Sequence, residues 1–386
     1  MNTLDIEALF SVNKKILKLV GLYPIMLKKY FTCLFFMLLI VIPEIHQIYI
    51  NQNNLKTILE TASVLLTIIL AILKSVIWLL KKDTINLIDF LFTVYWKIAI
   101  SVDGSNDIYQ YARSARRITI GYCILICNAL LVFFGIPLMS YAVNRSNDNQ
   151  NSTIKFNLPF VASYPKIFYE SPIFEMIYLS QLLATSTCGI IILGTDTLIA
   201  TAIFHTCGHF VILIINLEKL VISPIKNIDN SKKIDKEFNL IIKHHQTIIR
   251  FSQRIENIFS PMMLVQVIAS SIIICLVGFQ VNSTFSEGDG LAEYLSYLLM
   301  ALFQLLIFCW PGDELINKSK MISQAAYSTN WYFASDNVKK KIRFMVFRGQ
   351  KPCFLSAGKF SYLNLEYFST ILSTSVSYFT LLRKTQ

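Results

Sequence analysis

Charged residues are scarce in this sequence. Only 15% of its 386 residues are Asp, Glu, Lys or Arg, whereas about 25% is usual for a soluble domain. Hydrophobic residues account for 54% of the chain, and the mean hydropathy is +0.53. The apolar runs are continuous rather than alternating, which argues against a transmembrane β-barrel and for membrane-spanning helices. The composition therefore predicts an all-α membrane protein.

Signatures of catalysis are missing as well. The sequence contains no Gly-rich phosphate loop, no G-x-S-x-G elbow, no H-E-x-x-H and no paired Cys-x-x-Cys. His205 and His209 stand four residues apart on one helix face, a spacing that could begin a metal site, but no nearby carboxylate or cysteine pair completes it. We therefore predict no enzyme, no cofactor and no bound metal.

Seven apolar runs are long enough to cross the hydrocarbon core, which takes about 20 helical residues. They cover residues 30–50, 59–80, 118–143, 173–193, 255–281, 291–312 and 360–382. The chain then divides into a cytosolic amphipathic N-terminal segment (1–29), helices one to four (30–193), a cytosolic helical extension and loop (194–254), helices five and six (255–312), a second cytosolic segment (313–359) and helix seven (360–382).

The basic residues give this layout a direction. Of the 35 Lys and Arg residues, 28 fall in the segments assigned to the cytosol, six fall outside, and Lys74 lies within the second span. Basic residues accumulate in cytosolic loops, so the amino terminus is predicted inside and the carboxy terminus outside. Lys74, near the inner end of its span, is expected to snorkel. The net charge of +11 is explained in the same way, and we predict no nucleic-acid partner.

One apolar run, residues 173–217, is long enough for two crossings. A second crossing would place a cluster of eight basic residues outside, and the second half of the run contains Asp196 and two histidines, which are costly in lipid. This half is therefore predicted to project into the cytosol.

Glycosylation motifs agree with the predicted direction. Asn144 and Asn151 fall in the longest outer loop, and Asn282 falls in the short outer loop before the sixth span. The motif at Asn317 falls in a cytosolic segment and is expected to be unused.

The outer halves of spans two, three, four and six share aromatic and apolar side chains with scattered hydroxyl groups. A cavity of this composition suits a small, mostly apolar ligand oriented by one or two hydrogen bonds. Taken singly, each position is also explained by helix packing. The candidate ligand-binding residues are Ala62, Leu66, Thr67, Val132, Gly135, Met139, Tyr178, Leu182, Thr185, Tyr294, Tyr297 and Leu298.

The last span carries a stripe of hydroxyl groups that includes Ser373, Thr374, Ser377 and Thr380. Pore lining and hydrogen bonding between helices fit this stripe equally well. Glu366 lies one and a half turns into the span, and its role can also be interpreted in two ways. Its carboxylate could attract cations at the inner side of a pore, or the residue could be buried or interfacial.

The C-terminal part of the chain closely resembles the insect odorant receptors. The matching residues span about 75 positions in consistent order. They are Trp310-Pro-Gly-Asp-Glu-Leu315, Ser319, Ala326-Tyr327, Trp331, Arg348-Gly-Gln-Lys-Pro352, Ala357-Gly-Lys-Phe360 and Ser377-Tyr-Phe-Thr-Leu-Leu382. The rest of the chain matches that family mainly in hydropathy and topology.

This resemblance implies a function in olfaction. It implies a heterotetrameric, odorant-gated, nonselective cation channel in which a tuned receptor subunit assembles with a common odorant co-receptor. The expected ligand is a small volatile organic molecule, and the expected location is the plasma membrane of olfactory sensory neurons, among membrane lipids. The cytosolic segments are implied to anchor the subunits to one another, and the ligand pocket is implied to lie among the outer halves of spans two, three, four and six.

The resemblance also implies that the last span lines the pore. Leu381 takes the position of the hydrophobic gate, with Ser377 and Tyr378 a turn below it and Thr385 a turn above. Arg383 and Lys384 follow the gate, and a ring of four such pairs would repel cations. We therefore expect the chain to depend on a co-receptor that dilutes this charge.

Two other readings stay open. A gustatory receptor of the same superfamily shares the architecture but usually works without this co-receptor, and the Ser377–Leu382 ending argues against it. A small-molecule transporter is an alternative of a different class, although no internal repeat supports it. A rhodopsin-like receptor is excluded because its amino terminus lies outside.

Overall fold

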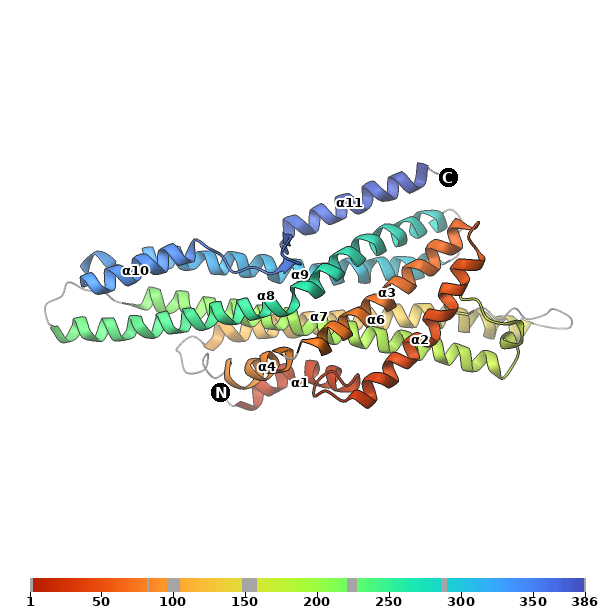
Figure 1. The fold of residues 1–386 in the computed structure, drawn as a ribbon, viewed down its shortest axis with the longest axis horizontal. Helices are drawn as coiled ribbons and strands as arrows, with labels where there is room; N and C mark the ends of the chain where they lie inside the picture. Colours follow the sequence, from red (N-terminus) through yellow and green to blue (C-terminus); the bar gives the residue numbers. More distant parts are fainter. Residues whose placement is uncertain are drawn as a thin grey trace.

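Long helices form almost all of the chain (Figure 1). The computed structural model describes residues 3–81, 83–95, 105–147, 158–220, 228–285 and 290–384. The elements are α1 (Thr3–Leu19), α2 (Leu27–Ile50), α3 (Leu55–Leu80), α4 (Asp83–Phe90), η1 (Leu91–Tyr95), α6 (Ser105–Asn147), η2 (Lys166–Tyr169), α7 (Ile173–Lys219), α8 (Ile228–Phe285), α9 (Leu291–Tyr327), η3 (Trp331–Phe333), α10 (Asp336–Gly349), β1 (Ser356–Ala357), β2 (Ser361–Tyr362) and α11 (Leu365–Lys384).

Six helices in the described part of the chain are long and apolar enough to cross a membrane, namely α2, α3, α6, α7, α8 and α9. The seventh predicted span corresponds to α11. This helix has 20 residues, but its many hydroxyl groups lower its hydropathy. The count of seven crossings and the sides on which the two termini lie stay predictions.

Four helices are much longer than the spans predicted from them, and α6, with 43 residues, is one of the four. α7 has 47 residues, α8 has 58 and α9 has 37, and each continues without a break from a predicted span into a predicted cytosolic segment. Their extensions form the narrow end of the elongated molecule together with α10 (Figure 1). There α10 is tied to α8 by an ion pair between Lys341 Nζ and Asp235 Oδ1 at 2.6 Å.

α7 is the central helix of the bundle. Every residue from 191 to 210 is buried, and the helix packs against α1, α2, α3, α6, α8 and α9. A helix that is apolar on all sides is normally buried on all sides. The amphipathic N-terminal segment contributes to this packing, because the Asn13 amide in α1 donates to the Thr197 and Thr201 hydroxyls, each at 3.3 Å.

The position of Lys74 differs from the expectation that it snorkels. Its side chain is fully buried, and Nζ lies 2.5 Å from Oδ1 of Asp196, which is also fully buried. Asp196 thus avoids the cost of facing lipid by pairing inside the protein.

α11 lies along one edge of the molecule, and a short β1–β2 hairpin precedes it (Figure 1). It packs against α8 and α9. The segment before it approaches α9 so closely that a Cβ on Gly312 would lie 2.1 Å from the Leu363 carbonyl oxygen. The Pro-Gly step in α9 therefore has a steric reason, since only glycine leaves room for the backbone that leads into α11.

Candidate functional site

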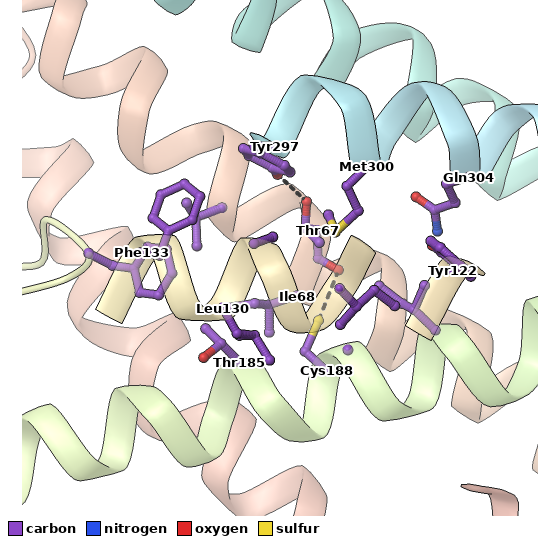
Figure 2. Close-up of a pocket in the computed structure, with 16 residues that line it drawn as sticks. Thr67, Ile68, Tyr122, Leu130, Phe133, Thr185, Cys188, Tyr297, Met300 and Gln304 are labelled. Carbon is purple, nitrogen blue, oxygen red and sulfur yellow. Dashed lines mark hydrogen bonds between the residues drawn. The ribbon is translucent and has the colours of Figure 1, made fainter. Parts of the chain in front are cut away.

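A small cavity lies among α3, α6, α7 and α9 (Figure 2). Its volume is about 90 Å³, less than the 150 Å³ or so of a cavity that binds benzene. The lining is almost entirely apolar and aromatic. It consists of Val64, Thr67, Ile68, Tyr122, Ile126, Ala129, Leu130, Phe133, Phe160, Thr185, Cys188, Gly189, Ile192, Tyr297, Met300 and Gln304.

Most polar groups in this lining already have partners within the protein. The Tyr297 hydroxyl donates to the Ser63 carbonyl at 2.9 Å and is hydrogen-bonded to the Thr67 hydroxyl. The Thr185 hydroxyl donates to the Gln181 carbonyl at 2.8 Å. The Tyr297 bonds tie α9 to α3, whereas the Thr185 bond lies within α7. Both leave the cavity wall effectively apolar.

One end of the cavity is different, where Tyr122 and Gln304 lie together (Figure 2). The Gln304 amide donates to Oδ2 of Asp196 at 3.0 Å and to Oε1 of Gln266 at 3.2 Å. The Tyr122 hydroxyl is buried and has no hydrogen-bond partner among the described residues. A hydroxyl in this state is available to a ligand.

A second and larger hollow of about 680 Å³ adjoins the cavity. We call it the vestibule. It lies between the later part of α2, the first turns of α3 and α9, and residues 158–162. Its polar lining includes Glu44, Glu60, Ser63, Tyr169, Glu293 and Tyr294. Val64, Phe133, Phe160 and Tyr297 line both spaces. The two hollows are therefore neighbours separated by no more than these four side chains.

The structure separates the predicted ligand-binding residues into groups. Thr67, Thr185 and Tyr297 line the cavity, and Tyr294 and Tyr297 line the vestibule. The partly buried remainder comprises Ala62, Leu66, Val132, Gly135, Tyr178, Leu182 and Leu298. Met139 is 69% exposed. Whether any of these residues binds a ligand stays a prediction.

Sequence reasoning did not identify the deeper lining residues, such as Ile126, Phe133, Met300 and Gln304. They lie on the same helices as the predicted residues. What distinguishes them is that they lie on the faces of α6 and α9 that surround the cavity beside α7. These faces cannot be identified from the sequence before the packing of α7 is known.

The predicted pore residues lie on α11 or beyond it. Glu366, Ser377 and Tyr378 are exposed. The backbone of Leu381 and Lys384 belongs to α11, whereas their side chains and the whole of Thr385 lie outside the described residues.

Among the predicted glycosylation sites, Asn282 is exposed near the end of α8. Asn144 lies in the last turns of α6 with its side chain outside the described part of the chain, and Asn151 lies outside it altogether.

One of the two histidines considered as metal ligands, His209, joins two helices. His209 Nδ1 in α7 lies 3.0 Å from His244 Nε2 in α8, within hydrogen-bonding distance. In the described ranges, no three His, Cys, Asp or Glu side chains converge in a way that could hold a metal ion.

The helices and the cavity define a multi-pass, all-α membrane protein with a small apolar pocket in its bundle. Comparison with known proteins identifies the family within this class. A sequence model described as 7tm Odorant receptor matches residues 54–376. Odorant receptor 13a of Drosophila melanogaster is 29% identical over 353 residues, which cover 86% of this chain and 81% of that protein. Odorant receptor 82a of the same species is 22% identical, over 92% and 91% of the two chains.

Solved structures agree with this comparison at the level of the fold. The olfactory receptor OR5 from Machilis hrabei, in complex with eugenol, superposes with a TM-score of 0.83 over 99% of both chains at 15% sequence identity. A structure of the same receptor described without a ligand gives a TM-score of 0.74 at 17% identity, over 93% of this chain and 89% of that one. The chain therefore belongs to the insect odorant receptor family, whose members are membrane receptors and channels rather than enzymes.

Proposed function

We propose that this chain is the ligand-tuned subunit of an odorant-gated, nonselective cation channel and that a small volatile molecule binds in the cavity between α3, α6, α7 and α9. The apolar cavity inside the bundle carries this proposal. Apolar walls favour transfer of a hydrophobic volatile from water, and a few polar groups orient it. The small volume favours a small ligand, or one whose end reaches the vestibule.

The pore is proposed to be lined by α11. Its exposed hydroxyls are satisfied by its own backbone, as in Ser373 to the Ser369 carbonyl at 3.0 Å and Ser377 to the Ser373 carbonyl at 2.9 Å. Such a helix is stable beside water and beside protein. The exposed side of α11 at the edge of the subunit is then the side that meets the other subunits around the pore.

A chain of hydrogen bonds supports communication between the cavity and α11. Gln304 at the cavity bonds Gln266 in α8, whose amide donates to the Ser270 hydroxyl at 2.6 Å. The next residue, Ser271, accepts through its carbonyl from the Ser375 hydroxyl of α11 at 3.3 Å. A ligand that displaces Gln304 would thus act on the helix that contacts α11.

The test is electrical recording from cells that express this chain with and without an odorant co-receptor, against an odor panel. We expect ligand-gated cation current only with the partner. Currents of equal size from this chain alone would contradict the co-receptor requirement and favour a gustatory-type channel. Saturable uptake without current would favour a transporter.

A cavity-filling variant tests the location of the ligand. Ala129→Phe places a ring in the cavity and should raise the half-maximal odorant concentration about tenfold or more. Leu131→Phe is the matched control, because Leu131 is two residues away in α6 and 72% exposed. Equal responses of both variants at equal surface expression would place the ligand elsewhere.

A further inference from the structure

Glu44 in α2 is an unusual buried group. Its side chain is fully buried, and neither carboxylate oxygen has a hydrogen-bond partner within the described ranges. Removing a charged carboxylate from water without a partner costs several kcal/mol. A group of this kind in a folded protein calls for a partner, and Glu44 lines the vestibule.

The vestibule wall contains other acidic residues besides Glu44. Glu60 and Glu293 also line it, and their carboxyl groups lie within electrostatic reach of each other. No Lys, Arg or His belongs to the described lining. The wall therefore gathers three carboxyl groups with no basic side chain among its described residues.

Aromatic rings accompany these carboxylates. Tyr169, Tyr294 and Tyr297 line the same space. Carboxylates and ring faces together are the groups that recognise an organic ammonium ion, through charge-assisted hydrogen bonds and cation–π contacts. An inorganic divalent ion fits less well, because no three acidic side chains in the described part of the chain converge as metal ligands.

We propose that the vestibule binds an ammonium group at Glu44, and that its ligand is a short alkylamine whose apolar end enters the adjoining cavity. The shared wall of Val64, Phe133, Phe160 and Tyr297 provides that route. Binding supplies the buried Glu44 carboxylate with a cation that the described residues do not provide. The inference rests on the proposed role of the cavity and adds to it the charge class of the ligand.

A matched pair of odorants tests this proposal in the full chain expressed with a co-receptor. Isopentylamine is protonated at neutral pH, whereas isopentanol has the same carbon chain and no charge. Glu44→Gln should raise the half-maximal concentration of isopentylamine about tenfold or more and leave that of isopentanol within about twofold. Glu293→Gln should act in the same direction. Glu170→Gln is the control, since Glu170 is exposed and does not line the vestibule.

The outcomes separate this proposal from the proposed function. If isopentanol opens the channel and Glu44→Gln shifts both odorants equally or neither, the ammonium site is wrong and the cavity assignment survives. If no odorant evokes current, the proposed function fails, and binding of isopentylamine to the purified full chain decides the ammonium site alone. That measurement uses phosphatidylglycerol nanodiscs, which contain no ammonium group. If isopentylamine binds equally well to the chain and to Glu44→Gln, or binds to neither, the proposal is overturned.

An ammonium group can also come from a lipid. Adding phosphatidylcholine to the nanodiscs distinguishes the two sources. Unchanged isopentylamine affinity assigns the site to a free amine. Competition that disappears in Glu44→Gln confirms the ammonium site and assigns it to the lipid headgroup.

Discussion

Lys74 and Asp196 form an ion pair in the middle of the bundle, with both side chains fully buried. Asp196 also accepts a hydrogen bond from Gln304 at the cavity. A buried pair contributes little net stability compared with apolar residues, but removing one partner leaves an uncompensated charge. The consequence of a substitution therefore depends on whether one charge is removed or both.

Lys74→Met should lower the free energy of unfolding by about 3–5 kcal/mol, because it leaves Asp196 unpaired. The double variant Lys74→Met/Asp196→Leu should recover most of that loss. Thermal unfolding of the full chain in detergent measures both. Lys318→Met is the control, since its pair with Glu314 is partly exposed and is worth at most about 0.5 kcal/mol. A double variant less stable than Lys74→Met would contradict this explanation.

The sequence alone could not place these two residues together. Lys74 near a span end fits snorkelling, and Asp196 in an apolar run fits a departure from the membrane. The pairing becomes visible only when α3 and α7 pack, and 122 residues separate the two partners. The candidate site shows the same limit, because Thr67 and Tyr297 were predicted, whereas Gln304 and Phe133 depend on which helix faces meet.

At the scale of elements, hydropathy was sufficient to find the helices but not their ends. A run of apolar residues is a local property, so the six long apolar helices lie where the sequence predicted spans. The continuation of α8 and α9 through predicted boundaries depends on contacts with α10, which no local pattern reports. Large parts of both predicted anchor segments therefore belong to helices that also form the bundle, whereas α10 is a separate helix packed against them.

The junction between α9 and α11 gives an element-scale prediction. Gly312→Ala would place a Cβ against the Leu363 backbone, so it should displace the segment before α11 and reduce surface expression and odorant current. Gly278→Ala in α8 has nothing within 4 Å of its new Cβ. It should be neutral or stabilise the helix by up to about 1 kcal/mol. Normal currents in Gly312→Ala would show that this close approach does not position α11.

At the scale of the whole molecule, the direction of the chain in the membrane is open to a direct test. The predicted topology places Asn144, Asn151 and Asn282 outside and Asn317 inside. Asn282 is exposed, as an acceptor must be. Single Asn→Gln variants at used outer sites should each remove one glycan after expression in animal cells, seen as a mobility shift before but not after endoglycosidase treatment. Glycan loss in Asn317→Gln would reverse the proposed direction.

The buried Lys74–Asp196 pair also constrains how the protein is made. Synthesis reaches Asp196 122 residues after Lys74, which at roughly 5–20 residues per second corresponds to about 6–24 seconds. During that interval the Lys74 ammonium group has no Asp196 to neutralise it, and a lone charge in lipid is costly. We therefore expect α3 either to stay at the translocon until α7 emerges or to hold the Lys74 ammonium group at the membrane surface until then, and in both cases the final packing of α3 waits for α7.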